Sequence, residues 1–320
     1  MKPAVFLDTA SLDQGDLSWD GLTRALPGLT GYESTRPDQT LDRCRNAEII
    51  ITNKVVLDAG ILEQLAALRL ICVTATGTNN IDLNYCAEHG IAVCNVRDYA
   101  TASVVQHVFT LILALTTRLT LYRAAVAAGD WTRSSQFCLL DFPISELAGK
   151  TLGVIGYGVL GKAVAEVASA FGLKVIVAQR PGSKHCHEGR VPLHELYARA
   201  DIISLHCPLA DNTRGLISAE SLSQMQDHAL LINTARGGLV DESALALALR
   251  EGHIGGAGLD VLSQEPPPAD HPLLAKDIPN LLITPHIAWA SRESRQRLLD
   301  QVGDNIMAYL NGQPQNVVTP

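Results

Sequence analysis

The chain has 320 residues, of which 47% are hydrophobic and 18% charged, and its formal net charge is -8. This length exceeds what one hydrophobic core usually organises, and the composition excludes a disordered chain, so we expect two folded domains. The acidic balance gives no reason to expect nucleic acid or an anionic membrane as a partner, although a local arginine could still bind a small anion.

The sequence carries no signal for secretion or membrane insertion. The first residues lack a basic region followed by a long apolar run, and the longest apolar stretch, around 104–115, contains polar residues and is too short to span a bilayer. The seven cysteines are odd in number and form no C-x-x-C pair. We therefore expect reduced thiols, each packed as a small core residue, in a cytoplasmic protein.

The first hundred residues alternate short apolar runs with amphipathic stretches. Buried strands are predicted at 4–8, 47–53, 68–77 and 91–96, and helical spacing is present in 57–68 and 81–90. This alternation predicts a parallel sheet covered by helices. One long helix is expected next, beginning at Thr101 or Ser103 and ending at Gly129.

A second alternating series begins at Lys150. Its predicted strands are 150–156, 174–179, 201–207, 229–235, 257–261 and 281–286. Helices lie between them, the first over 159–172, so a second parallel α/β sheet is expected. The last amphipathic helix falls in 290–312, where Gly312 ends it.

A glycine motif joins the first strand and the first helix of this second series. Gly156, Gly158 and Gly161 stand in G-x-G-x-x-G register. The first glycine allows a tight turn, the second lets the backbone approach a pyrophosphate, and the third lets helix and strand pack closely. The helix N-terminus offers N–H groups to phosphates. Unless this is an ordinary glycine-rich turn, a dinucleotide binds Gly156, Tyr157, Gly158, Val159, Leu160 and Gly161.

The end of the next strand bears on which dinucleotide binds. About twenty positions past the motif, an acidic residue would bind the adenosine ribose 2′-hydroxyl. Here Gln179 stands instead, and Arg180, Ser183 and Lys184 follow it. Without a carboxylate nothing repels a 2′-phosphate, and Arg180 can pair with one, which favours NADP over NAD. The alternative is that Arg180 and Lys184 are solvated loop charges.

Three strands of the second series are each followed by a polar residue: Arg236, Glu265 and His286. In an open α/β sheet the carboxyl ends of the strands border the ligand crevice, so these side chains can converge. The combination resembles the D-2-hydroxyacid dehydrogenase family, and the resemblance covers most of the chain. The stretches TATGTNNID, SVVQHVF, WTRSSQFCLLDFPISELAGKTLGVIG and TPHIAWAS resemble its glycerate dehydrogenase (hydroxypyruvate reductase) branch in particular.

The resemblance implies an architecture. It implies an α/β protein of two Rossmann-like or flavodoxin-like domains with parallel sheets. The substrate domain is formed by 1–99 and 289–320, and the NAD(P)-binding domain, 100–288, is inserted in it. A homodimer assembled through the cofactor domain is also implied, with the long helix after Thr101 and the apolar stretch 137–140 as interface material.

The chemistry of such a reaction explains the residue types. Reducing a 2-oxoacid requires a hydride at the carbonyl carbon and a proton at the carbonyl oxygen, and histidine is the natural proton donor near neutral pH. A carboxylate bonded to the imidazole favours its charged form, and an arginine can grip the substrate carboxylate and polarise the carbonyl. By resemblance, His286 is the acid/base, Glu265 its partner and Arg236 the substrate anchor. Taken singly, each could be structural.

The remaining expected contacts come from the same resemblance. Ala75, Thr76 and Gly77 follow a strand, and their backbone N–H groups suit the substrate carboxylate, which this loop binds in the family. Further cofactor contacts are implied for Cys207, Pro208, Thr213, Thr234, Ala235 and Asp260, the last with the nicotinamide carboxamide.

Other polar residues are expected to stand outside the chemistry. Gln106 and His107 are predicted to be interdomain contacts of the long helix. The stretch with His185, Cys186 and His187 lacks a complete ligand set, so no metal is expected.

The implied activity is reversible reduction of hydroxypyruvate or glyoxylate to D-glycerate or glycolate with NAD(P)H. One alternative keeps the fold and changes the substrate to a bulkier 2-oxoacid or phosphite. Another is a dinucleotide-sensing scaffold like the corepressors of the C-terminal-binding-protein type. The complete Arg, Glu and His set does not exclude that role, and the lack of long tails or a basic patch disfavours it.

Overall fold

The computed structural model of the protein describes residues 2–183 and 186–319. The chain forms two compact units, of which unit 1 comprises Met1–Ala100 with Ala290–Pro320, and unit 2 comprises Thr101–Trp289. Lys184 and His185, named in the sequence analysis, lie outside the described residues.

Unit 1 is built on a five-stranded parallel sheet of order β2-β1-β3-β4-β5. Its strands are β1 (Ala4–Phe6), β2 (Leu29–Gly31), β3 (Ile49–Thr52), β4 (Leu70–Val73) and β5 (Ala92–Cys94). All four predicted strands are present. β2 was not predicted, because this three-residue edge strand is largely exposed and has no apolar run to mark it.

Short helices and one long helix cover this sheet. They are the 3-10 turn Thr9–Ser11, α1 (Asp20–Ala25), α2 (Pro37–Cys44), α3 (Ala59–Leu62), α4 (Leu83–Glu88) and α12 (Arg292–Leu310). α12 packs closely on α1, where Gly303 faces the backbone of Gly21. The last helix was predicted correctly, with Ser291 capping its start and Gly312 following its end.

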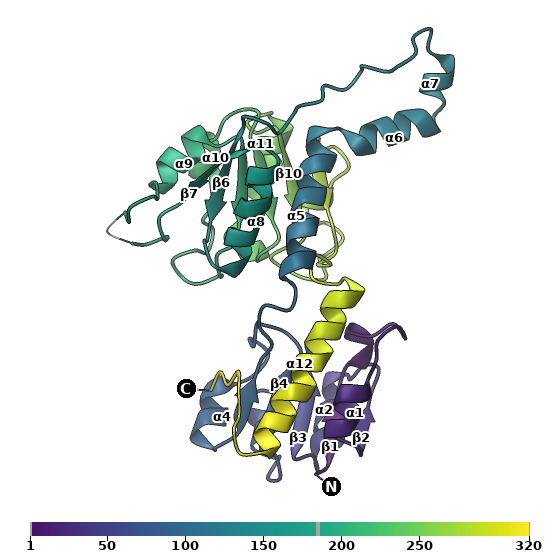
Figure 1. The fold of residues 1–320 in the computed structure, drawn as a ribbon, viewed down its shortest axis with the longest axis vertical. Helices are drawn as coiled ribbons and strands as arrows, with labels where there is room; N and C mark the ends of the chain where they lie inside the picture. The colour runs from purple at the N-terminus through teal and green to yellow at the C-terminus, as the bar shows by residue number, and fades with distance from the viewer. Residues whose placement is uncertain (1, 184–185, 320) are drawn as a thin grey trace. The chain divides into compact units, whose positions relative to one another are not determined.

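Unit 2 is built on a six-stranded parallel sheet of order β11-β10-β9-β8-β6-β7 (Figure 1). Its strands are β6 (Thr151–Ile155), β7 (Lys174–Val177), β8 (Ile202–Leu205), β9 (Leu230–Asn233), β10 (Gly256–Leu259) and β11 (Leu281–Ile283). Each overlaps a predicted strand, so the predicted α/β class with two parallel sheets is confirmed. β6 has β7 on one side and β8 on the other, and this reversal of strand order marks a ligand crevice at the carboxyl ends.

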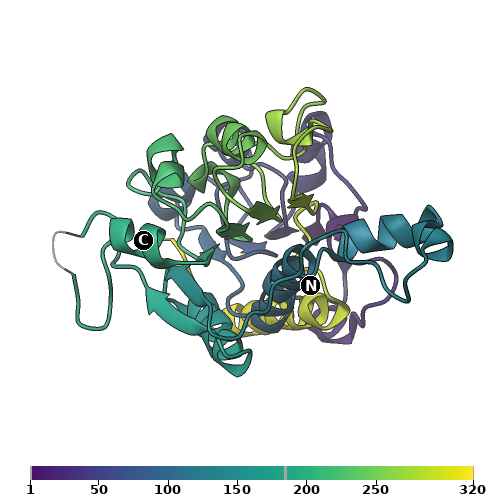
Figure 2. The same cartoon turned by 90° about the horizontal axis from the view of Figure 1, so that it is seen from above.

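Helices cover both faces of the second sheet. The helices of unit 2 are α5 (Thr101–Thr116), α6 (Leu119–Ala127), α7 (Asp130–Arg133), α8 (Val159–Ala170), α9 (Leu193–Arg199), α10 (Ala219–Ser223) and α11 (Glu242–Arg250), with 3-10 turns Gly237–Leu239 and Pro272–Leu274. The view in Figure 2 places α9, α10 and α11, in green, on one face and α5 and α8, in blue and teal, on the other. Successive residues of β6 explain this, because Gly153 faces Leu196 of α9 whereas Val154 faces Gly161 of α8.

The prediction of one helix from Thr101 to Gly129 is wrong. α5 ends at Thr116 and α6 begins at Leu119, with a bend of 60° between them. Thr116 and Thr117 bond back to carbonyl groups of the preceding turn, and Arg118 adopts a left-handed conformation with φ 55°. The backbone therefore leaves α5 at Arg118, and α6 and α7 project from the sheet (Figure 1).

Two further findings concern the apolar residues and the cysteines. Among the described residues no single helix is long and apolar enough to cross a membrane, although the bent pair α5 and α6 passes the same test together. All seven cysteines are free. The expectation that each is a core residue is wrong for Cys138, which is half-buried, and for Cys186, which is exposed on a polar loop.

Candidate active site

The glycine turn after β6 has the geometry that a dinucleotide requires. Gly156 has φ 95°, and a Cβ on it would lie 2.4 Å from the backbone N of Cys207. A Cβ on Gly161 would lie 2.0 Å from the carbonyl oxygen of Gly156. Neither position accepts a side chain, so the tight turn and the close helix packing are both present.

The second glycine of the motif differs from the other two. No atom lies within 4 Å of a Cβ built on Gly158, which is the N-cap of α8. The position is open, and Val159 beside it is 52% exposed although it is apolar. The open side of the turn thus leaves room for a pyrophosphate at the N-terminal end of α8, and Tyr157 and Leu160 flank it.

The three residues predicted to converge follow adjacent strands. Arg236 follows β9, Glu265 follows β10 and His286 follows β11, and these strands are neighbours in the sheet. Their loops therefore lie at the same edge as the glycine turn.

His286 and Glu265 meet directly. The His286 Nδ1 lies 2.6 Å from the Glu265 Oε2. Because a carboxylate only accepts hydrogen bonds, Nδ1 donates and carries a hydrogen. The other oxygen, Oε1, accepts from the Leu262 N–H at 2.9 Å. Both oxygens of Glu265 are thus held by hydrogen bonds. The other ring nitrogen of His286, Nε2, is not bonded to Glu265 in this pair.

The turn that carries His286 is held by the carboxylate of Asp260. His286 has φ 56°, a conformation that costs about 1–3 kcal/mol and persists only where its surroundings enforce it. Asp260 accepts from the N–H groups of Ile287 at 2.9 Å and Ala288 at 2.8 Å. It also accepts from the Thr284 hydroxyl at 2.6 Å. This carboxylate is 1% exposed, so Asp260 has a positioning task besides the predicted cofactor contact.

Two aromatic rings complete the support of this turn. The Trp289 Nε1 donates to the carbonyl oxygen of His286 at 3.0 Å. On α5, the His107 Nε2 lies 2.8 Å from the Thr284 hydroxyl and 3.5 Å from Asp260. His107 was expected to be an interdomain contact, and these bonds lie within its own unit.

Arg236 is presented by a turn that sequence reasoning did not describe. The side chain of Asn233 donates to the Arg236 carbonyl at 2.8 Å and accepts from the Ala235 N–H at 3.0 Å. The Arg236 side chain is exposed and donates to the Ala235 carbonyl. A Cβ on Gly237 would lie 1.9 Å from the carbonyl carbon of Leu262, so the Arg236 turn packs against the Glu265 turn. The structure thus brings the two turns together.

Two orphaned polar atoms lie at the carboxyl ends of adjacent strands. Within the described chain, the Thr234 Oγ1 and the His206 Nδ1 are buried without a hydrogen-bond partner. Thr234 follows β9 and His206 follows β8. Buried polar atoms are normally hydrogen-bonded, so these two atoms are suited to bind a polar ligand at this edge, such as a dinucleotide. Burial lowers the pKa of His206 to about 4, which leaves His206 neutral and excludes it as the proton donor at neutral pH.

The segment after β8 forms a compact turn. The Thr213 hydroxyl donates to the Pro208 carbonyl at 2.8 Å and accepts from the Ala210 N–H at 2.8 Å. Cys207 is buried beside the glycine turn and Pro208 is exposed. Cys207 and Pro208 therefore stand next to Gly156, whereas Thr213 shapes the turn.

A second arginine, Arg190, lies near Arg180 at the end of β7, although it comes from a later part of the chain. Gln179 is half-buried and Arg180 is exposed. The Arg190 Nη1 donates to the Ala178 carbonyl at 3.0 Å, and its guanidinium lies 5.7 Å from the ring centroid of Tyr157. Arg190 thus connects the end of β7 to the glycine turn, a proximity that its sequence position did not reveal.

The loop 75–77 belongs to unit 1 and follows β4. The Thr76 hydroxyl donates to the Val96 carbonyl at 2.9 Å, and the Asn95 side chain donates to the Thr76 carbonyl at 2.8 Å. Ala75 is buried, Thr76 exposed and Gly77 half-buried. The loop is thus fixed by the segment that follows β5.

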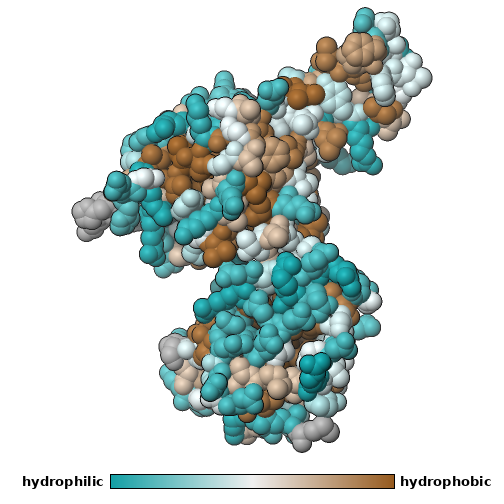
Figure 3. All heavy atoms as spheres, viewed as in Figure 1, coloured by the Kyte–Doolittle hydropathy of each residue, from teal (hydrophilic) through white to brown (hydrophobic). Residues whose placement is uncertain are grey.

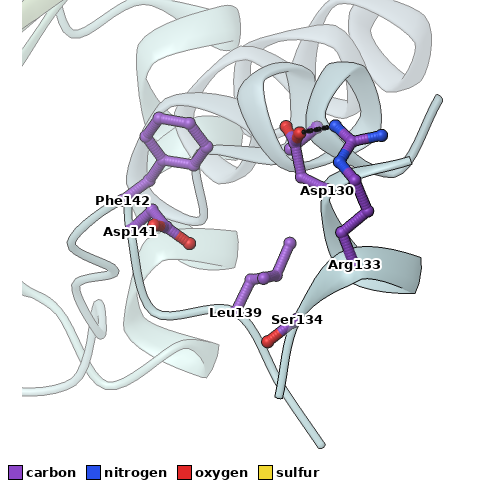
Figure 4. Close-up of a pocket in the computed structure, with 7 residues that line it drawn as sticks. Asp130, Arg133, Ser134, Leu139, Asp141 and Phe142 are labelled. Carbon is purple, nitrogen blue, oxygen red and sulfur yellow. Dashed lines mark hydrogen bonds and ion pairs between the residues drawn. The ribbon is translucent and has the colours of Figure 1, made fainter. Parts of the chain in front are cut away.

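Two other features do not form part of this edge. In the part of the chain that the structure describes, no group of three or more His, Cys, Asp or Glu side chains could hold a metal ion. A cavity of about 430 Å³ is present at α6 and α7 (Figure 4), and no predicted site residue lines it. Its lining residues are Ala125, Asp130, Arg133, Ser134, Leu139, Asp141 and Phe142.

Comparisons with known proteins agree with this arrangement. The sequence profile of the "D-isomer specific 2-hydroxyacid dehydrogenase, NAD binding domain" matches residues 109–288. The chain is 46% identical to the glycerate dehydrogenase of Methylorubrum extorquens, over 99% of each chain. It is 38% identical to the hydroxypyruvate reductase of Blautia hydrogenotrophica, over 98% of each.

A solved structure shows the same fold. It is an acyclic imino acid reductase (Bsp5) in complex with NADPH and D-Arg, with a TM-score of 0.86 at 31% identity, over 99% of this chain and 100% of that one. The full-length coverage, the glycine turn and the strand-end residues point to one kind of enzyme. The chain belongs to the D-isomer-specific 2-hydroxyacid dehydrogenase family, nicotinamide-dinucleotide-dependent oxidoreductases that interconvert 2-oxoacids and 2-hydroxyacids.

Proposed function

We propose that this enzyme reduces hydroxypyruvate or glyoxylate to D-glycerate or glycolate with NAD(P)H, in a reversible reaction. The observation that carries the proposal is the 2.6 Å bond between His286 and Glu265 at the sheet edge that also bears the glycine turn. An imidazole fixed in this way beside a dinucleotide site suits proton exchange with a substrate oxygen.

The proposed roles follow from the contacts of each side chain. When bound, the nicotinamide supplies the hydride that reaches the carbonyl carbon. His286 gives the proton to the carbonyl oxygen from Nε2, because its Nδ1 is engaged by Glu265. The Glu265 carboxylate favours the protonated imidazole before transfer and stabilises it again in the reverse direction.

The substrate carboxylate needs its own anchors. We assign Arg236 to it, because an exposed guanidinium can form two parallel bonds with a carboxylate, and Gly237 keeps its turn against that of Glu265. The backbone N–H groups of Ala75, Thr76 and Gly77 are assigned to the same anion. Units 1 and 2 then act as substrate and cofactor domains.

The identity of the substrate rests on the relatives. A glycerate dehydrogenase and a hydroxypyruvate reductase each match almost the entire chain. Both names refer to the same pair of small three-carbon acids. Glyoxylate is the two-carbon analogue of hydroxypyruvate and carries the same 2-oxoacid group.

For the cofactor we propose NADP(H) rather than NAD(H), in contact with Cys207, Pro208, Thr234 and Ala235 beside the glycine turn and with Asp260 at the nicotinamide. The family profile refers to NAD, and the similar imino acid reductase holds NADPH. Support for NADP comes from Gln179, which replaces the carboxylate, and from Arg180 and Arg190. Because Arg190 is already held by Ala178 and Tyr157, little side-chain entropy is lost when it meets a 2′-phosphate.

We also propose a homodimer through α6, α7 and the segment that follows them. Large apolar side chains gather on this projecting part of unit 2 (Figure 3), among them Trp131, Phe137 and Leu140, the last two 89% and 82% exposed. Exposure of this kind is typical of a protein–protein contact.

No nucleic acid or membrane partner is proposed, and the free cysteines fit a cytoplasmic location.

Steady-state oxidation of NADPH and NADH with a panel of 2-oxoacids tests the function. The panel holds hydroxypyruvate, glyoxylate, pyruvate and a branched 2-oxoacid, with phosphite oxidation as a further arm. The highest kcat/KM is expected with hydroxypyruvate or glyoxylate. Higher efficiency with the branched acid or phosphite would change the substrate, and no turnover with any of them would refute the proposal.

The cofactor and the assembly have separate tests. Arg180→Ala and Arg190→Ala are expected to raise KM for NADPH and leave KM for NADH unchanged, with Arg199→Ala on α9 as control. A wild-type preference for NADH of tenfold, about 1.4 kcal/mol, would contradict the NADP assignment.

Analytical ultracentrifugation is expected to show a dimer that Phe137→Ser weakens and Val56→Ser, on unit 1, does not.

A further inference from the structure

A second carboxylate–imidazole pair lies behind the Glu265 turn. Glu242 is the first residue of α11, and its carboxylate accepts from the Ser263 N–H at 2.7 Å, from the Ser263 hydroxyl, and from the His271 Nε2 at 3.1 Å. The side chains of Glu242 and His271 are 10% and 5% exposed. Neither residue belongs to the set proposed to exchange the proton or to bind the substrate and the cofactor.

The bonds of His271 define its state. Its Nδ1 accepts from the Leu273 N–H at 3.3 Å, so this nitrogen carries no hydrogen. The hydrogen is therefore on Nε2, which donates to Glu242. A neutral histidine and an ionised glutamate satisfy all of these bonds at once. A glutamine at this position would have only one acceptor oxygen. Its NH2 group would then face at least one of the three groups that donate to Glu242.

The Glu242 bonds act on the turn that presents Glu265. Ser263 donates its N–H to Glu242, and the residue before it, Leu262, donates its N–H to Glu265. Two carboxylates thus hold consecutive peptide groups of one turn. Gly237 packs on the same two residues, so the turn has little freedom on that side either. The direction of the Glu265 side chain follows from the placement of this turn.

We propose that Glu242, fixed by His271, is a positioning residue for proton transfer: it holds the turn 262–265 so that Glu265 stays bonded to His286. The inference rests on the proposed roles of His286 and Glu265. The other ionisable groups around His286 are Asp260, which holds the turn 284–288, and His107 of α5. Arg236 presents its guanidinium at the adjacent turn.

A purely structural role for this pair makes a different prediction. If Glu242 only stabilises the fold, its loss lowers the melting temperature and leaves the pH profile of the remaining activity unchanged. If it positions Glu265, its loss also lowers kcat and moves the basic limb of kcat/KM for reduction to lower pH. The direction follows because a carboxylate less well placed favours the protonated imidazole less.

The test is the pH profile of reduction by Glu242→Gln in the full-length enzyme, with hydroxypyruvate and saturating NADPH. We expect kcat to fall about tenfold, KM for hydroxypyruvate to change less, and the basic limb to move as in Glu265→Gln. Glu251→Gln, at the other end of α11 and exposed to solvent, is the matched control and is expected to retain the wild-type profile. Fluorescence titration with NADPH is expected to give similar affinities for all variants.

A double variant decides whether Glu242 acts through Glu265. In the Glu265→Gln background, Glu242→Gln is expected to cause no further movement of the basic limb. An additional movement, or an unchanged profile in the single variant, overturns the inference. If Glu265→Gln itself leaves the profile unchanged, the proposed role of Glu265 fails instead.

A milder variant covers the case in which Glu242→Gln does not fold. Ser263→Ala removes the hydroxyl donor and keeps the Ser263 N–H bond and the carboxylate. Ser263 is exposed, so the fold tolerates the change. We expect a smaller movement of the basic limb in the same direction, and a wild-type profile would contradict the inference.

Discussion

The imidazole of His286 and the carboxylate of Glu265 lie 21 positions apart in sequence and 2.6 Å apart in the structure. Each is held from behind by another carboxylate. Asp260 accepts from the turn of His286, and Glu242 accepts from the turn of Glu265. The pair is therefore placed by two independent sets of bonds, and small displacements of either turn separate it.

His286→Ala is expected to lower kcat for reduction by about 10²–10⁴-fold, the range for loss of a general acid or base. Affinity for NADPH, measured by fluorescence titration, is expected to stay nearly unchanged, because the glycine turn lies on other strands. His228→Ala, a histidine exposed at the surface, serves as the control. Activity that survives in His286→Ala would mean that the proton comes from another group.

Gly237→Ala is expected to separate the turns of Arg236 and Glu265. The added Cβ would lie 1.9 Å from a backbone carbon of Leu262, which cannot be relieved by a side-chain rotation. Overpacking of this kind costs about 1–3 kcal/mol in unfolding free energy, and kcat/KM falls with it. At Gly238 the nearest atom is the end of the Leu209 side chain, 3.0 Å away. Gly238→Ala is thus expected to cost less in both chemical denaturation and turnover, and equal losses would contradict this explanation.

The strand ends were predictable because buried parallel strands are recognisable in the sequence as short apolar runs. β9, β10 and β11 each overlap such a run, and the sheet brings their following residues to one edge. That edge made the convergence of Glu265 and His286 predictable, and the family resemblance supplied their pairing. The edge strand β2 escaped prediction because its three residues are largely exposed. The break at Arg118 escaped because apolar spacing continues through it, while hydroxyl bonds and a left-handed residue end α5.

The supporting residues of the site could not be predicted in the same way. Glu242 looks like an ordinary acidic residue at a helix start, and His271 like a loop histidine. Only the fold brings both to Ser263, because the bonds join segments 21 and 29 positions apart. Arg190 belongs to the same class, since its contact with Tyr157 depends on the path of the loop between β7 and α9. Such residues carry no spacing signal, whereas the glycine motif does.

The two glycines of the turn after β6 are expected to respond differently to alanine. Gly156→Ala places a Cβ 2.4 Å from the Cys207 backbone at φ 95°, so it should lower both the melting temperature and the affinity for NADPH. Gly158→Ala meets no atom within 4 Å, so the melting temperature should stay unchanged. The methyl group still occupies the space assigned to the pyrophosphate, and the affinity for NADPH should fall about tenfold or more. Unchanged affinity in Gly158→Ala would place the phosphates elsewhere.

Asp16 provides a prediction about acid stability of unit 1. Its carboxylate accepts from both terminal nitrogens of Arg295 on α12, at 2.8 and 2.7 Å. The hydrogen bond with Arg295 lowers the pKa of Asp16 from 3.8 to about 2. A folded-state pKa below the ordinary value means that the stabilisation is complete above the ordinary pKa and is lost as the pH falls towards 2.

Asp16→Asn is therefore expected to lower the melting temperature modestly at pH 7, and its difference from the wild type should shrink between pH 4 and pH 2. Calorimetric scans from pH 2 to pH 7 measure this difference. Arg295 also donates to the carbonyl groups of Leu12 and Ala290, so Arg295→Gln should cost more than Asp16→Asn. In the Arg295→Gln background, Asp16→Asn should have almost no further effect at pH 7, because the carboxylate has already lost its partner. A difference between wild type and Asp16→Asn that is independent of pH would mean that this ion pair does not stabilise the position of α12.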